Sequence, residues 1–323
     1  MPDSTAAARR APLPTPDDPG RGAGDPATPA VGGALPSDAA VLARASGENF
    51  IVASRLLPRR SRTALLAFYG YARLVDQIGD AVEGDRNAAL DWVAGQLDTA
   101  LSGAPGAAPL VADAVAATLE SGADPSLLRD LIGANRQDQT RTRYETYDEL
   151  LAYCRLSANP VGRLVLGAFG ASTPQRETWS DAVCTGLQLA EHWQDVAEDA
   201  RAGRIYLPLE DLRRFSIDED EVLDTSARGG PASTPLRALI GFETARARTL
   251  LQAGAPLVAS LRGRARLAVA GYVAGGLAAL DAVAAARFDP FAGPPRAPKA
   301  RVAARTAALL LQAHPRSAPG GRP

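Results

Sequence analysis

The chain has 323 residues and a formal net charge of −1, from 35 basic and 36 acidic side chains. This balance gives no reason to expect nucleic-acid binding. The two cysteines, Cys154 and Cys184, are too few for a disulfide framework or a metal-ligand cluster, so we expect buried thiols in a reducing compartment. No apolar run of signal-peptide length follows the early arginines, and we expect a cytoplasmic protein.

The first 38 residues are rich in Pro, Ala, Gly and Asp and have almost no large apolar side chains, which predicts a disordered arm. From there on the pattern is helical, and no convincing strand pattern appears. Helices are predicted over residues 46–57, 63–79, 87–101, 110–121, 126–138, 217–223 and 236–252, from Asp148 and from Pro174, and twice between 257 and 287.

The helix predicted over 63–79 leads into an acid pair with helical spacing. Asp76 and Asp80 are four residues apart, and Tyr69 and Arg73 precede them on the same face. These four residues fall at offsets 0, 4, 7 and 11, so they form one polar stripe along a helix.

A second stripe with the same offsets lies in the stretch from Gly186 to Pro208. It consists of Gln188, His192, Asp195 and Asp199, and the chain then turns at a glycine into RIYLP. Like charges at this spacing repel, so a bound cation or a basic partner is expected to compensate. Two such helices facing one cleft predict a Mg²⁺ site, because Mg²⁺ takes carboxylate and phosphate oxygens. Solvated surface helices are the alternative.

The C-terminal third contains the most apolar stretch, LAVAGYVAGGLAALDAVAAA. Asp281, the flanking arginines and the glycines favour a buried core helix over a membrane span. Residues 299–313 carry arginines, leucines and no acid, which predicts a basic amphipathic helix in peripheral contact with the inner face of the cell membrane. A frayed terminal helix is the alternative. We therefore expect an all-α, single-domain bundle over 39–290, preceded by the arm and followed by a basic tail over 291–323.

Three stretches, ENFIVASRLLP, YARLVDQIGD and LQLAEHWQDVAEDARAGRIYLP, resemble the squalene and phytoene synthase family of head-to-head prenyl synthases. The resemblance runs from about residue 48 to 289. It implies an isoprenoid synthase fold with a central active-site cavity and a long-chain isoprenoid diphosphate substrate. The metal ligands and catalytic acids it implies are Asp76, Asp80, Asp195, Asp199 and Glu191. The substrate-binding residues it implies are Phe50, Tyr69, Arg73, Tyr153, Ala158, Gly162, Gln188, Arg204 and Tyr206. Core packing is the alternative for the aromatic and small residues among them. Trp193 is a further candidate for the aromatic lining of the cavity, and core packing is the preferred interpretation for it.

The sequence departs from the family at two positions. Gln77 stands where many members have a second adjacent acid, and Glu191 stands where many have Asn. We expect Glu191 to lie near the metal, as a ligand or as an extra charge that repositions a metal or a water.

Within the family, these stretches look most like the branch that makes hydroxysqualene in bacterial hopanoid pathways. That resemblance implies loss of diphosphate from presqualene diphosphate and capture of the cation by water. Glu191, His192 and Gln194, near the second motif, are the candidates for positioning that water, and the alternative is that all three face solvent. No Gly-rich dinucleotide fingerprint is evident, so we expect no nicotinamide cofactor. Hand-over to other enzymes of the squalene pathway is a further expectation. The alternatives are synthesis of squalene, phytoene or presqualene diphosphate from two prenyl diphosphates, and a non-catalytic relative that acts in assembly or binding.

Overall fold

A computed structural model of the protein describes residues 57–312, and every regular element within them is an α-helix. The helices are α2 (Arg59–Ala81), α3 (Arg86–Leu101), α4 (Pro109–Ser121), α5 (Ser126–Asp138), α6 (Tyr147–Ser157), α7 (Asn159–Ala168), α8 (Pro174–Arg201), α9 (Leu209–Arg214), α10 (Glu219–Arg228), α11 (Thr234–Gly254), α12 (Pro256–Ser260), α13 (Gly263–Ala285) and α14 (Lys299–Gln312). The expected all-α isoprenoid synthase fold is confirmed. The arm over 1–38, the helix predicted over 46–57 apart from its last residue, and Phe50 lie outside the described residues.

Most helix starts follow from local sequence. The side chain of Asp85 accepts a hydrogen bond from the Ala88 N–H at the start of α3, and Thr146 does the same for the Glu149 N–H at the start of α6. Helix α9, which has six residues and directly follows the RIYLP segment, was not predicted from the sequence. Its polar residues read as a loop, yet its Asp211 and Leu212 are buried.

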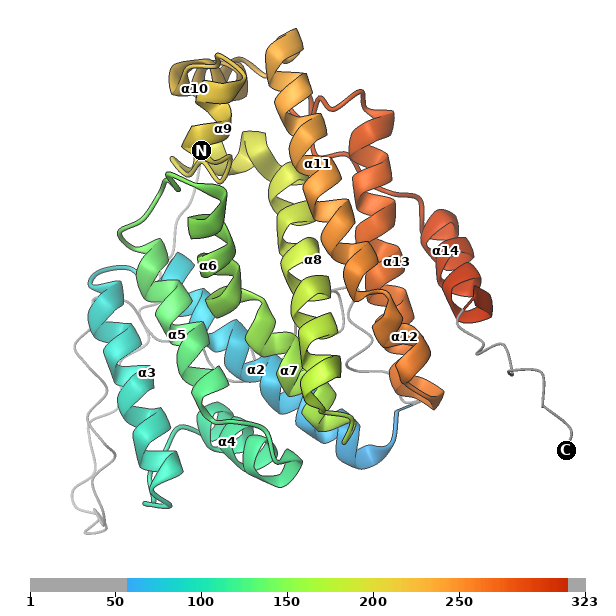
Figure 1. The fold of residues 1–323 in the computed structure, drawn as a ribbon. Helices are drawn as coiled ribbons and strands as arrows, with labels where there is room; N and C mark the ends of the chain where they lie inside the picture. The colour runs from blue at the N-terminus through green and yellow to red at the C-terminus, as the bar shows by residue number, and fades with distance from the viewer. Residues whose placement is uncertain (1–56, 313–323) are drawn as a thin grey trace, which may run out of the picture.

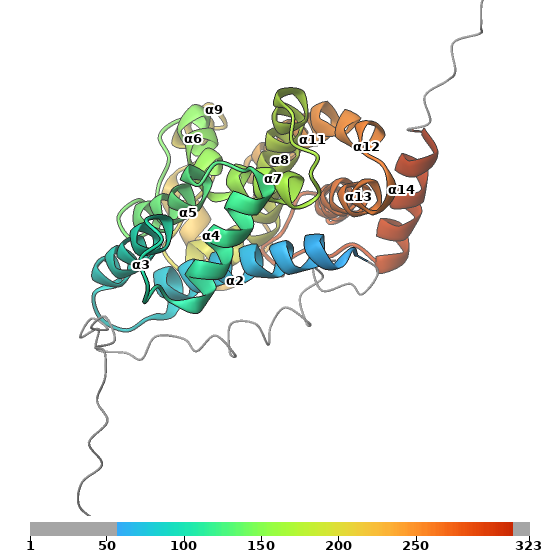
Figure 2. The same cartoon turned by 90° about the horizontal axis from the view of Figure 1, so that it is seen from below.

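The helices form two groups (Figures 1 and 2). Each group has its own apolar core. In the first group α2 packs against α3, α4, α5 and α7; in the second, α8 packs against α10, α11 and α13. Helices α6 and α7 touch both α5 and α8 and so join the groups. This arrangement leaves α2 and α8, the two helices with the acid stripes, as the walls of a cleft.

Glycines allow α8 and α11 to approach closely. A Cβ added at Gly186 would lie 2.8 Å from Leu251 Cγ and 3.1 Å from the Ala247 carbonyl oxygen. A Cβ at Gly254 would lie 2.5 Å from the Trp179 carbonyl oxygen and 2.9 Å from the Val183 nitrogen. Since backbone atoms of the facing helix cannot move aside cheaply, these positions exclude side chains.

Two extended segments pair beside the cleft. The segment before α6 and the segment after α8 form an isolated parallel bridge between Arg143 and Ile205. The Ile205 N–H donates to the Thr142 carbonyl at 3.0 Å, and the Leu209 N–H donates to the Tyr144 carbonyl at 2.9 Å. These bonds pair backbone N–H and C=O groups that lie outside the helices. They also hold in place the segment that carries Arg204 and Tyr206.

Helix α13 is the one described helix that is long and apolar enough to cross a membrane. Within the bundle it packs against α8, α11, α12 and α14, and most of its apolar stretch is buried inside the protein. It therefore has the surroundings of a core helix. Helix α14 lies on its outer side, at the edge of the bundle (Figures 1 and 2).

A buried charge cluster fastens α9 to α11. Glu243 and Asp211 are both buried, and the Arg246 Nη1 lies 3.0 Å from a Glu243 oxygen and 2.5 Å from an Asp211 oxygen. The Arg246 guanidinium also lies over the Tyr147 ring at 4.2 Å. Burial of the Glu243 carboxyl raises its pKa to about 8, mainly through desolvation. Asp211, which shares the single Arg246 with Glu243, raises this pKa further.

This cluster predicts that stability falls with rising pH. Between about pH 4.5 and pH 8 the folded protein keeps a proton on Glu243 that the unfolded chain has lost, so unfolding becomes easier as pH increases through that window. Glu243→Gln carries no such proton. We expect its thermal midpoint to exceed that of the wild type at pH 8 and to match it near pH 4.5. Thermal unfolding of both proteins across this range tests the prediction, and parallel curves for the two would contradict it.

Candidate active site

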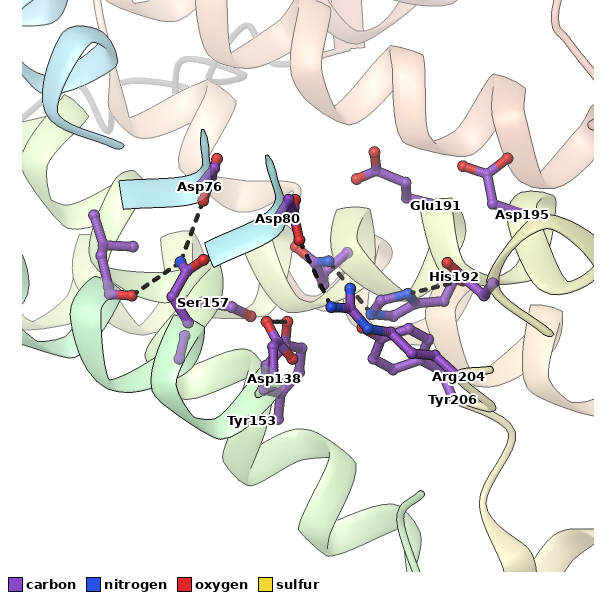
Figure 3. Close-up of a pocket in the computed structure, with 15 residues that line it drawn as sticks. Asp76, Asp80, Asp138, Tyr153, Ser157, Glu191, His192, Asp195, Arg204 and Tyr206 are labelled. Carbon is purple, nitrogen blue, oxygen red and sulfur yellow. Dashed lines mark hydrogen bonds and ion pairs between the residues drawn. The ribbon is translucent and has the colours of Figure 1, made fainter. Parts of the chain in front are cut away.

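Helix α2 supplies one wall of the cleft. Asp76 and Asp80 lie one turn apart on it and both line a cavity of about 350 Å³. The Nδ2 of Asn135 donates to Asp76 Oδ1 at 3.3 Å, and an Nη2 of Arg204 lies 3.6 Å from Asp80 Oδ1 (Figure 3). Arg204 thus connects the segment after α8 to the acid pair of α2.

Helix α8 supplies the opposite wall. All four members of its predicted stripe line the same cavity, namely Gln188, His192, Asp195 and Asp199, and so does Glu191. The His192 Nε2 lies 3.3 Å from Gln188 Nε2, and its Nδ1 lies 3.7 Å from Asp199 Oδ2. The stripe spacing read from the sequence therefore brings these side chains to one surface.

Helices α5 and α6 complete the cavity with residues that sequence reasoning missed. Asn135 and Asp138 come from α5 and Ser157 from α6. The available signal was the spacing of Leu131, Asn135 and Asp138 at offsets 0, 4 and 7, which matches the start of the two acid stripes. This stripe contains one acid instead of a pair, so by itself it does not indicate a metal site.

An aromatic group lies beneath the acids. The His192 ring stacks on Tyr206 with centroids 3.7 Å apart and planes at 17°. Tyr153 lies 6.0 Å from Tyr206, and its hydroxyl donates to Asp138 Oδ2 at 2.9 Å. Three predicted site residues, Tyr153, Tyr206 and Arg204, thus line the cavity together with the acids (Figure 3). Aromatic rings such as those of Tyr153 and Tyr206 suit a site that holds a cationic carbon centre.

The cavity carries excess negative charge. Although the Asp76 side chain is exposed where it lines the cavity, desolvation by the surrounding protein raises its pKa to about 6, and Asp80 adds to this increase. Desolvation, followed by repulsion from Glu191 and Asp199, raises the pKa of Asp195 to about 6. Desolvation does the same for Asp138, partly offset by the bond from Tyr153. Carboxylates that resist ionisation in this way favour a nearby cation.

The carboxylates of the cavity suit Mg²⁺ by their chemistry, but their spacing restricts how they could bind it. All the acidic donors are oxygens, the ligands that Mg²⁺ prefers. Within residues 57–312, no three His, Cys, Asp or Glu side chains lie close enough together to hold a metal ion by themselves. Carboxylates on two facing walls instead suit an ion whose remaining ligands are water and diphosphate oxygens.

A second pocket of about 380 Å³ adjoins the first between α8 and α13. Glu191 and Asp195 line both pockets, and Arg296 lines the second. The Nε2 of Gln194 donates to the Pro295 carbonyl in the linker before α14. Gln194, expected to position water, therefore faces this linker, whereas Glu191 and His192 line the acidic cavity.

The other predicted substrate-binding residues lie elsewhere in the described part of the chain. Tyr69 packs against the apolar core of the α2 group. Arg73 lies on α2 one turn before Asp76, whose pKa its charge lowers. Ala158 is buried where α6 meets α7. Gly162 is buried between α7 and α8, where an added Cβ would lie 2.4 Å from Ser180 Oγ and from Cys184 Sγ. Close helix packing explains these two small residues.

The sequence profile described as squalene/phytoene synthase matches residues 43–306. The chain belongs to the squalene/phytoene synthase family. Family members act on isoprenoid diphosphate substrates.

The chain is similar to several individual members of the squalene/phytoene synthase family. A hydroxysqualene synthase of Rhodopseudomonas palustris is 37% identical over 220 residues, which are 67% of this chain and 72% of the relative. A phytoene synthase of Arthrospira platensis is 32% identical over 62% of this chain and 68% of the relative. Among solved structures, squalene synthase HpnC from Alicyclobacillus acidocaldarius is 36% identical with a TM-score of 0.71, covering 77% of this chain and 92% of that one.

Proposed function

We propose that this protein converts presqualene diphosphate and water to hydroxysqualene and diphosphate, with Mg²⁺ as cofactor. The observation that carries the proposal is that the acid pairs of α2 and α8 line one cavity. The choice of product is supported by similarity to proteins named hydroxysqualene synthase at 35–37% identity.

The first step is departure of diphosphate. The bond between the cyclopropylcarbinyl carbon and the ester oxygen breaks, and the oxygen keeps the electron pair. Mg²⁺ bound by Asp76, Asp80, Asp195 and Asp199 would neutralise the leaving group. Arg204, which lies in the same cavity beside Asp80, is placed to bind a diphosphate oxygen. Glu191 lines the cavity next to Asp195 and remains our candidate for an additional ligand or charge near the metal.

The second step is control of the cation. The rings of Tyr153 and Tyr206 border the cavity, with His192 stacked on Tyr206, and place aromatic groups near a rearranging carbocation. Water then bonds to the carbon and loses a proton. Asp138 is our candidate acceptor, because it lines the cavity, holds a pKa of about 6 and is oriented by the Tyr153 hydroxyl.

A second function keeps support from the comparisons. Phytoene synthases match at 32% identity, so coupling of two prenyl diphosphates is the alternative. The non-catalytic alternative is disfavoured because all four aspartates are present and line one cavity.

The product of purified protein tests the proposal. We expect Mg²⁺ and presqualene diphosphate to give hydroxysqualene, identified by mass analysis of the extracted lipid, in equal yield with and without NADPH. A reduced product that forms only with NADPH would refute the assignment. Efficient turnover of farnesyl diphosphate alone would favour the coupling reaction instead.

A further inference from the structure

Two leucines are exposed where the end of α14 meets the start of α13. Leu311 is 75% exposed and Leu267 is 47% exposed, whereas most large apolar side chains of the described residues are covered. The Nη2 of Arg266 donates to the Leu310 carbonyl at 2.6 Å. This bond joins the neighbours of the two leucines, so Leu267 and Leu311 belong to one region of the surface.

Helix α14 is attached to the bundle by one face only. Arg305 pairs with Asp281 of α13, and Leu309 and Leu310 pack against the core. Its opposite face is exposed and apolar, consisting of Ala300, Ala303, Ala304, Ala307, Ala308 and Leu311. A solvent-facing helix surface is normally polar, so this face has the composition of a surface that contacts a less polar phase.

The charged side chains of α14 and of the first turn of α13 are all basic. Arg262 and Arg264 are exposed beside Leu267 at the start of α13, and Lys299 and Arg301 are exposed at the start of α14. The sequence has no acid between Glu243 and Asp281 and none after Asp289. Asp281 is itself paired with Arg248 and Arg305. An anionic surface would therefore meet no repelling carboxylate from these elements.

We propose that Arg262, Arg264, Leu267 and Leu311, here called the basic leucine patch, dock the protein on anionic phospholipid membranes. The leucines enter the head-group region and the arginines face lipid phosphates. A second copy of this chain is a poorer occupant, because two basic patches repel. Since α13 is held within the bundle, the docking is peripheral and reversible.

Vesicle sedimentation tests the patch without substrate, so its outcome is independent of the reaction. The full chain is mixed with phosphatidylcholine vesicles that contain or lack phosphatidylglycerol. We expect binding to the anionic vesicles that weakens as salt is added. Arg262→Ala/Arg264→Ala should reduce it about 25-fold, at about fivefold for each arginine. Leu267→Ser/Leu311→Ser should reduce it by a similar factor. The control is Leu119→Ser, which alters a leucine on α4 whose exposure of 58% lies between those of Leu267 and Leu311, and it should leave binding unchanged.

Several outcomes would overturn the proposal. One is equal binding to neutral and anionic vesicles. Another is that the patch variants bind like the wild type, or that Leu119→Ser weakens binding as much as they do. Sedimentation velocity without lipid provides the remaining check. If the patch variants convert a dimer to a monomer and leave vesicle binding intact, the patch is a contact between copies instead.

Discussion

Asp195→Asn is expected to lower turnover of presqualene diphosphate about a thousandfold, the scale on which loss of one transition-state-stabilising group reduces rates. Asp195 lies on the α8 wall, and its half-buried carboxylate stands beside Glu191 and Asp199. Asn has the same shape but lacks the charge that attracts a metal–diphosphate complex. Because the substitution also removes repulsion among neighbouring acids, the folded state should be no less stable than the wild type.

The matched control for this variant is Asp224→Asn. Asp224 lies on α10, is exposed, and pairs with Arg228 across 3.6 Å. An exposed pair of this kind contributes little to stability, so this variant should keep wild-type turnover and melting behaviour. Turnover is measured by lipid extraction and folding by circular dichroism. Near-normal activity in well-folded Asp195→Asn protein would show that the acid walls do not ionise the substrate.

Gly254→Ala is expected to destabilise the fold by about 3 kcal/mol, at the upper end of the usual cost of overpacking. The new methyl carbon would lie 2.5 Å from the Trp179 carbonyl oxygen and from Val183 Cγ2, and 2.9 Å from the Val183 nitrogen. The contacts include backbone of α8, so the strain cannot be relieved by a side-chain rotation. Since α8 also carries the acid stripe, separating α11 from it disturbs the site. We expect the thermal midpoint to fall by about 10 °C.

We expect Gly95→Ala, the same substitution at another glycine within a helix, to stabilise the fold. Gly95 lies in α3 with no neighbouring atom within 4 Å of an added Cβ. There alanine only reduces the freedom of the unfolded chain and improves helix propensity, so we expect a gain of about 0.5–1 kcal/mol. Equal midpoints for the two variants would show that close approach of α8 and α11 does not limit the fold.

Helical spacing was sufficient to predict both acid walls. A residue's face on a helix follows from its offset, so Asp76 with Asp80, and Asp195 with Asp199, were each predictable as pairs. That the two pairs face one cavity depends on packing between distant helices, and the resemblance to a known family supplied that step. The boundaries of α5 and the start of α14 were predicted from the sequence because a proline directly precedes each helix.

The rest of the site depends on contacts that no local pattern encodes. Asp138 is a lone acid at the end of α5, and only the packing of α6 brings it to Tyr153. Gln194 lies on the same helix as the acids, yet it turns to the linker at Pro295. In a sequence, a glycine that allows close helix packing looks the same as one that lines a lipid pocket. The side chains of Ser180 and Cys184, which lie against Gly162, indicate close packing here.

The backbone pairing of 142–145 with 205–210 sets a rule for recombining this protein with its relatives. Arg204 and Tyr206 belong to a short chain segment whose position depends on hydrogen bonds to residues more than 60 positions earlier. A crossover between α6 and α8 would join two parental versions of that pairing and misplace both side chains. Chimeras should inherit the two segments from the same parent, as one exchange unit. A library built on that constraint should retain far more active members than one with a crossover at the α7–α8 loop.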